Sequence, residues 1–300
     1  MSKRFSTWAW FYTAYLVGVI LFGAWVRISH SGAGCGAHWP LCDGEIIPTA
    51  PSAEKIIEYT HRVTSGLCGI LSIALSLWAW RLFGARSKAC MAAMLTLLFV
   101  IFEGAIGAGL VLGELVADDS SVARALVIVL HLTNTLMLTG CAAATAYFGK
   151  NPQSPARLSK HRGLLFTMGG LLTVTAMTGA VTALGDTLFP VQVGADGSLL
   201  ARVAAELGPS QHLLVRLRIL HPLFAVASGV FLLFGFDRLR ETTAGSWAKA
   251  GLILTVSQLG IGLLNIILAA PGFMQLLHLG LAQCLWVALV MSALKAQDSF

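Results

Sequence analysis

The 300 residues are 56% hydrophobic and only 11% charged, whereas soluble domains carry roughly 25% charged residues. This composition excludes an ordinary soluble enzyme and predicts an integral membrane protein. The net charge of +6 does not indicate a nucleic-acid partner, because the basic residues are concentrated in alternate loops between apolar runs.

Eight apolar runs are long enough to cross a bilayer, which takes about 20 residues each. The first run carries Trp8, Trp10 and Tyr12, which are typical of an interfacial aromatic belt and not of a cleaved signal. The predicted fold is therefore an all-α integral membrane protein with eight transmembrane helices. We expect them at residues 8–28, 60–83, 90–113, 123–147, 163–184, 217–236, 248–270 and 273–294.

The loops alternate in charge. Those around residues 84–88, 149–162 and 238–249 are rich in Lys and Arg, and the others carry most of the Asp and Glu. The positive-inside rule then places both termini in the cytoplasm. The second, fourth, sixth and eighth helices run inward from the outer face.

The two halves of the chain resemble each other. The basic loop Gly149–Lys160, with its two prolines, divides the chain into residues 1–150 and 151–300. Motifs of one half recur in the same order in the other, and they match His61 with His221, Glu103 with Gln258, Gly107 with Gly262, and His131 with His278. The predicted architecture is two pseudo-symmetric four-helix bundles related by an axis along the membrane normal.

Four histidines, His61, His131, His221 and His278, fall in helices that enter from the same face. A single such histidine is more often polar glue between helices, but two matched pairs favour a functional site. Two imidazoles facing each other across a four-helix bundle suit the axial positions of a haem. Zinc or copper would need further ligands, and no cysteine lies near these histidines in the sequence.

The halves differ at the position three residues before the matched histidines His61 and His221. It is Glu58 in the first half, on the same helix face as His61, and Arg218 in the second. This difference predicts that one half holds a cofactor and that the half with the acid does chemistry. The alternative for Glu58 is an ion pair with Arg62 at the membrane rim.

Three further charged residues have two interpretations each. Arg216 and Arg218 are candidates to bind haem propionates, or they only extend to the interface. Glu103, inside a predicted helix, is a candidate proton relay or a protonated structural carboxyl.

Two outer loops contain recognisable features. Cys35 and Cys42 lie outside the membrane, where thiols oxidise, so we expect a disulfide; a metal site with His38 is the alternative. In the loop before the sixth helix, Leu199, Leu200, Val203 and Leu207 have a helical spacing and predict a short amphipathic helix.

These residues together resemble one family. The segments "GAWVRISHSGAGCGAHWPLCDG" and "EYTHRVTSG", followed by single histidines in the fourth, sixth and eighth helices, are similar to haem A synthases over nearly the whole chain. Many members carry a second cysteine pair in the loop between the fifth and sixth helices. This sequence has none there, which puts any mechanism requiring both pairs in doubt.

The resemblance implies a function and assigns the halves. It implies an oxidoreductase of the bacterial inner membrane that oxidises a methyl group of haem O to a formyl group by two hydroxylations, giving haem A for cytochrome oxidase. It implies a haem b cofactor on His221 and His278, with substrate haem O beside His61, His131 and Glu58. Implied partners are haem O synthase and an unidentified electron partner. The runner-up is a di-haem electron carrier that leaves its haems unmodified, and a third reading is a transporter.

Overall fold

The computed structural model describes residues 1–49, 51–154, 160–191 and 199–296. Within these ranges the chain is helical, and eight spans are long and apolar enough to cross a membrane, which confirms the predicted fold class. The elements are α1 (Ser2–Ile28), α2 (Ala53–Phe83), α3 (Lys88–Leu112), α4 (Val122–Lys150), α5 (Arg162–Leu188), α6 (Leu199–Glu206), α7 (Leu213–Arg216), the 3-10 turn η1 (Leu217–Ile219), α8 (Leu220–Leu239), α9 (Gly245–Ile267) and α10 (Gly272–Lys295).

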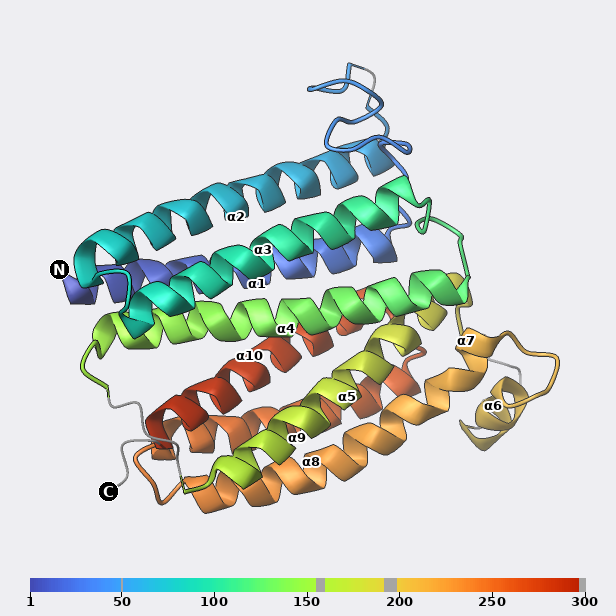
Figure 1. Ribbon diagram of the computed structural model, residues 1–300. Helices are drawn as coiled ribbons and strands as arrows, with labels where there is room; N and C mark the ends of the chain where they lie inside the picture. Colours follow the sequence, from blue (N-terminus) through green and yellow to red (C-terminus); the bar gives the residue numbers. More distant parts are fainter. Residues whose placement is uncertain (50, 155–159, 192–198, 297–300) are drawn as a thin grey trace.

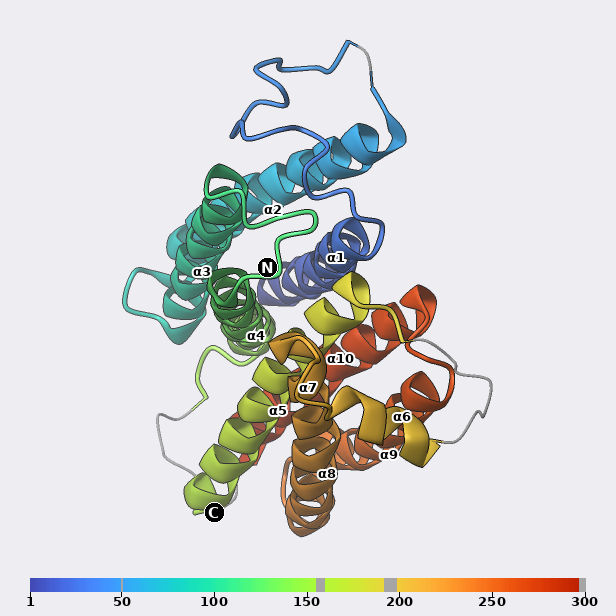
Figure 2. The ribbon, with the colours of Figure 1, turned by 90° about the vertical axis from the view of Figure 1, so that its right-hand side faces the viewer.

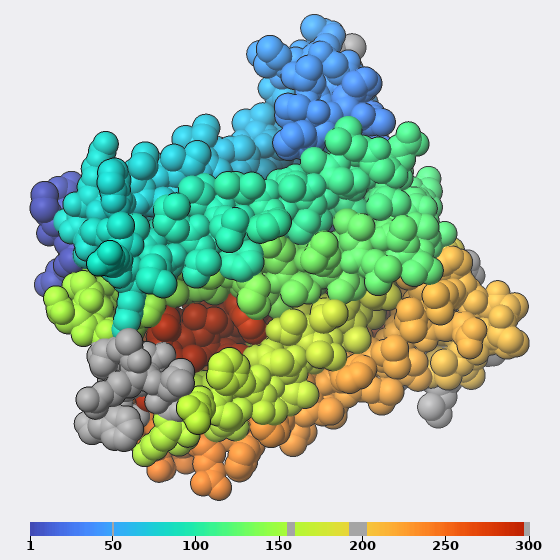
Figure 3. Space-filling view, viewed as in Figure 1, coloured from blue at the N-terminus to red at the C-terminus, as the bar shows by residue number. Residues whose placement is uncertain are grey.

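The helices contact one another in two groups. Helix α1 packs on α2, α2 on α3, α3 on α4, and α4 back on α1; helices α5, α8, α9 and α10 repeat the same circular order. Figure 2 shows the two groups one above the other. At the boundary between the groups, α4 contacts α5 and α10, and α1 contacts α10. In the space-filling view, α10 is visible between α4 and α5, because those two helices diverge toward the end where α1 begins (Figure 3).

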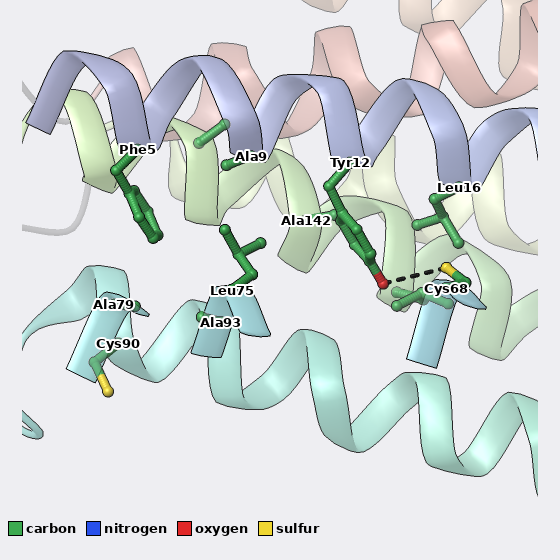
Figure 4. Packing of buried hydrophobic residues seen from close by; sticks show 12 residues of the cluster. Phe5, Ala9, Tyr12, Leu16, Cys68, Leu75, Ala79, Cys90, Ala93 and Ala142 are labelled. Atoms are coloured by element: carbon green, nitrogen blue, oxygen red, sulfur yellow. Dashed lines mark hydrogen bonds between the residues drawn. The ribbon is translucent and has the colours of Figure 1, made fainter. Parts of the chain in front are cut away.

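Small residues allow the helices of the first group to approach closely, as expected where lipid supplies no hydrophobic driving force between helices. Ala9, Ala79, Ala93 and Ala142 come from four different helices and meet in one buried cluster (Figure 4). In the same cluster the Cys68 thiol donates a hydrogen bond to the Tyr12 hydroxyl at 3.3 Å.

Both the beginning of α1 and the end of α10 lie at one end of the molecule (Figure 1). The opposite end, which we call the disulfide end, carries the loop of residues 29–52 together with α6 and α7. Helices α2, α4, α7 and α10 all begin there. The short helix predicted in the loop before the sixth span is present as α6.

Three spans begin four to seven residues earlier than the apolar runs predict, and the first of them, α1, begins at Ser2 instead of residue 8. Helix α2 begins at Ala53 instead of residue 60, because Ser52 caps it by accepting a hydrogen bond from the Lys55 amide at 3.3 Å. The span predicted at 217–236 begins with α7 at Leu213 and passes through a 3-10 turn. As a result His61 and His221 lie about two turns inside their spans and not at the mouths of the helices.

Candidate haem site

All four predicted histidines line one partly open cavity of about 1830 Å³. They lie six to nine residues from the start of their spans, at Ala53, Val122, Leu213 and Gly272, or about 9–14 Å along the helix at 1.5 Å per residue. Pockets for a single ligand are commonly about 300–1,000 Å³. This cavity therefore has the volume for two large ligands at one depth.

Three of the four imidazoles lie directly against a glycine of a neighbouring helix. A Cβ atom on Gly23 would stand 2.9 Å from Cε1 of His61, one on Gly179 would stand 2.9 Å from Cε1 of His221, and one on Gly262 would stand 3.2 Å from Cε1 of His278. Contacts below about 3 Å are closer than carbon atoms approach in a packed interior. The bare backbone of each glycine thus makes room for the ring.

The pair His221 and His278 fits two axial ligands of one iron. Their ring centres are 6.1 Å apart and the rings are nearly perpendicular, at 87°. Two ring nitrogens each about 2 Å from one metal ion place the ring centres roughly 6 Å apart. Nδ1 of His221 lies 3.1 Å from the carbonyl oxygen of Thr175, which directs the other nitrogen elsewhere. On His278, Nε2 lies 3.2 Å from the amide nitrogen of Gln258, and Nδ1 is buried without a partner among the described residues.

The pair His61 and His131 has different surroundings. The ring of His61 meets Phe22 edge-on at 5.7 Å, and its buried Nδ1 has no partner in the described part of the chain. Nδ1 of His131 lies 3.1 Å from Oε1 of Glu103. Both histidines line the large cavity, so the residues present suit haem in this half also.

Glu58 is 4% exposed and lines the same cavity. Its Oε1 accepts hydrogen bonds from Arg62 at 2.5 and 3.1 Å, and its Oε2 accepts one from the backbone N–H of Cys35 at 2.8 Å. Arg62 in turn donates to the carbonyl oxygens of His38 and Leu41. The ion pair with Arg62 is thus present, but it is buried and connects α2 to the outer loop.

Cys35 and Cys42 form a disulfide, which confirms that prediction. Both sulfur atoms are consumed in the bond, so the alternative metal site with His38 is excluded. In the ranges that the structure covers, no three His, Cys, Asp or Glu side chains group as ligands for a free metal ion.

The two arginines predicted for propionates lie in different environments. Arg216 is exposed and borders the cavity. Arg218 is 6% exposed; it pairs with Asp186 at 3.0 Å and Glu206 at 2.9 Å, and it donates to the carbonyl oxygens of Gly185 and Phe189. Its guanidinium is already occupied in holding α6 and the end of α5 together.

Arg27 is a charged residue that lines the cavity and was not predicted. Arg27, in the last turn of α1, donates to the carbonyl oxygen of Ala183 and the hydroxyl of Thr187 on α5, and to Oε1 of Gln275 on α10 at 3.0 Å. It therefore connects the two groups of helices beside the cavity. The only signal in the sequence is its position, an arginine still inside an apolar run, since no motif predicts its partners.

Comparison with known proteins gives one consistent result. The family model of COX15-CtaA, described as cytochrome oxidase assembly protein, matches residues 6–290. A protoheme IX farnesyltransferase of Thermus thermophilus is 45% identical over 303 residues, which cover 99% of this chain and 49% of the relative. A heme A synthase of Halalkalibacterium halodurans is 38% identical over 170 residues, 55% of this chain and 54% of the relative. A heme A synthase of Alkalihalophilus pseudofirmus is 43% identical over 111 residues, 37% of each chain.

The match therefore spans about half the length of the first two of these relatives, 49% and 54%. It spans 37% of the third. The family match, in contrast, runs through all eight membrane spans and includes the disulfide loop and the four histidines of the cavity. The chain belongs to the COX15-CtaA family of cytochrome oxidase assembly proteins.

Proposed function

We propose that this protein is a haem A synthase, which oxidises a methyl group of haem O to a formyl group. The observation that carries the proposal is the arrangement of four histidines as two pairs on one cavity large enough for two haems. Relatives named heme A synthase support it. In the reaction, electrons and protons leave the methyl carbon and oxygen is added in two successive hydroxylations; the second gives a hydrate that loses water.

The half formed by residues 151–300 would hold the cofactor haem b through His221 and His278. Their ring separation of 6.1 Å supports this assignment. When bound, the haem supplies one-electron redox chemistry. Gly179 and Gly262 fix the rings by close contact, and Thr175 fixes the tautomer of His221.

The half formed by residues 1–150 holds the substrate, and a difference in space supports this assignment. Gly104 on α3 corresponds to Leu259 on α9, one residue after the matched pair Glu103 and Gln258. In the second half, Leu259 fills the space above Gly229, where a Cβ would meet its side chain at 2.9 Å. In the first half, a Cβ on Gly104 would meet nothing within 4 Å. Haem O carries a farnesyl-derived chain that haem b lacks, and the open space suits it.

Glu58 lies in the substrate half and lines the cavity, so its carboxylate is our candidate for accepting protons or stabilising positive charge near the methyl group. Its contacts with Cys35 and Arg62 also hold the loop. Glu58→Gln should leave haem bound and stop oxidation. If the variant makes normal amounts of haem A, Glu58 has a structural role only.

The disulfide is tested separately. Changing Cys35 and Cys42 together to serine removes the disulfide but keeps the Glu58 and Arg62 contacts to the loop backbone. If haem A yield is unchanged, the disulfide is not needed for the reaction.

The charge pattern supports the orientation: the disulfide end faces the outside of a bacterial inner membrane, and both termini lie in the cytoplasm. Arg216, exposed at the edge of the cavity, is then placed to bind a propionate, while Arg218 supports the loop beside it. The substrate must come from a reaction that adds a farnesyl group to protohaem. A relative named for that transfer, about twice as long as the matched segment, supports haem O synthase as partner.

The decisive experiment is production of the protein in cells that supply haem O, followed by chromatography and mass measurement of the extracted haems. Haem A, or a haem O with one added oxygen on the methyl carbon, is expected. Haem b alone, tightly bound in two copies, would overturn the proposal and favour a di-haem electron carrier. A variant with both His61 and His131 changed to alanine is the matched negative control.

A further inference from the structure

His131 is the exception among the four histidines of the cavity. The other three lie against glycines at 2.9–3.2 Å from the position of a Cβ atom, but Gly107, which corresponds to Gly262, has nothing within 4 Å of that position. His131 instead faces a carboxylate: Oε1 of Glu103 is 3.1 Å from its Nδ1. The two groups are within ion-pairing distance, and Nδ1 forms no hydrogen bond of regular geometry among the described residues.

The carboxylate of Glu103 is held in place from α4. Thr135 donates its hydroxyl to Oε1 at 2.5 Å, and Asn134 donates its amide to Oε2 and to the carbonyl oxygen of Phe99. Ionised carboxylates inside a membrane span are costly unless they are paired and hydrogen-bonded. Both oxygens of Glu103 have donors, and the side chain is fixed beside the histidine.

The second half lacks this arrangement. The residue that corresponds to Glu103 is Gln258, whose amide lies 3.2 Å from Nε2 of His278. The residues that correspond to Asn134 and Thr135, counted from the matched histidines, are Leu281 and Ala282. A charged acceptor with its own donors is therefore built only at the histidine of the first half.

We propose that Glu103 is a positioning residue that holds the Nδ1–H of His131, leaves Nε2 for iron, and makes His131 a stronger electron donor to iron than His278. Carboxylates behind a ligating histidine fix its tautomer and raise its basicity, and a more strongly donating axial ligand stabilises ferric iron. The two irons would then differ in reduction potential, with the lower potential in the first half. The inference rests on the proposed function only in that His131 binds a haem iron.

The test measures potentials and not turnover. Protein produced in cells that supply protohaem but no farnesylated haem carries the same haem in both halves, and a redox titration should resolve two components. Glu103→Gln should move the lower potential upward and leave the other unchanged. His221→Ala identifies the component of the second half. The matched control is Glu114→Gln, the same change two residues beyond the end of α3.

A conservative variant separates the role of the carboxylate from folding effects at Glu103. Glu103→Asp keeps the carboxylate but shortens its reach to Nδ1 of His131, so it should move the lower potential by less than Glu103→Gln does, and the electron paramagnetic resonance signal of that ferric haem should change with the potential. Removing the carboxylate should also weaken retention of haem in the first half, by roughly 10- to 100-fold for loss of such a partner. A wild-type protein with one titrating component, or Glu103→Gln with both potentials unchanged, would overturn the inference.

The two proposals fail separately. If the protein makes no haem A but the potentials shift as stated, the proposed function is wrong and the role of Glu103 stands. If haem A is made and Glu103→Gln leaves both potentials in place, only the inference about Glu103 is lost.

Discussion

Glu58 and Arg218 occupy corresponding positions, three residues before the matched histidines His61 and His221, and carry opposite charges. Glu58 receives the Cys35 amide and Arg62, and so holds the loop of the disulfide end to α2. Arg218 binds Asp186 and Glu206, and so holds α6 to the ends of α5 and α8. Each residue fixes the loop of its own half.

The comparison changes the meaning of the charge difference. A charge difference between duplicated halves first suggests that the halves have different chemical roles. Here, however, Glu58 and Arg218 both attach a loop to the helices of their own half, with charges of opposite sign. The loop contacts alone could explain why a carboxylate is present at residue 58. A catalytic role for Glu58 therefore needs evidence other than these contacts. Glu58 does line the cavity, and the Glu58→Gln variant is the test that separates the two roles.

The largest expected effect is on haem content. His221→Ala should remove the haem of the second half and leave that of the first, so that the protein carries about one haem per chain in place of two. His61→Ala should do the opposite. Pyridine haemochrome assay against protein concentration measures both. Equal loss of all haem from either variant would mean that the halves do not bind independently.

Arg218→Ala should destabilise the protein by about 1.5–3 kcal/mol, because it leaves two partly buried carboxylates without their cation. Thermal unfolding in detergent measures the change. The control is Arg240→Ala, which removes an arginine whose partner Asp237 is also exposed and should change stability by less than about 1 kcal/mol. Similar melting temperatures for both variants would show that Arg218 does not hold the loop.

Exchanging the residues over the open space should exchange selectivity. Gly104→Leu should weaken binding of haem O relative to haem b by roughly 10- to 100-fold, since overpacking costs about 1–3 kcal/mol. Leu259→Gly should allow haem O into the second half. Competition between the two haems, followed by extraction and chromatography, reports the ratio. An unchanged ratio in both variants would mean that the space over Gly104 does not decide which half binds haem O.

The smallest effect concerns the exposed side of the first loop. A hydrogen bond from Lys55 lowers the pKa of Asp43 below its usual value, with further contributions from the charges of Lys55, His38 and Arg62. A carboxyl with a lowered pKa in the folded state adds stability above its ordinary pKa, and this stability is lost as pH falls through the folded value. Melting temperatures between neutral pH and about pH 3 should fall slightly less in Lys55→Met than in wild type. Asp43→Asn should show the same reduced slope, and high salt should remove the difference.

Much of the fold follows from the sequence alone. Apolar length predicts all eight spans, because a bilayer leaves few alternatives to a helix of about 20 residues. The start of α2 was misjudged by seven residues, since Glu54, Lys55 and Glu58 are too polar to belong to an apolar run. The N-cap Ser52 was the available signal.

The site was predicted in its residues but not in their contacts. The four histidines stand out because imidazoles are costly in lipid and occur as matched pairs. The bond from the Cys35 amide to Glu58, and the bridge from Arg27 to α5 and α10, depend on how loops and helices meet in three dimensions. The spacing of residues along one helix does not predict contacts with residues far away in the sequence.

The glycines against the histidines have a consequence for how the protein tolerates change. Gly23, Gly179 and Gly262 contain no group that can bind iron, yet at Gly23 and Gly179 even one added methyl group would occupy space that an imidazole already fills. In a complete mutational scan these positions should therefore behave like the ligands themselves. Gly107, with open space above it, should accept alanine, and that contrast would separate the one histidine held by a carboxylate from the three held by bare backbone.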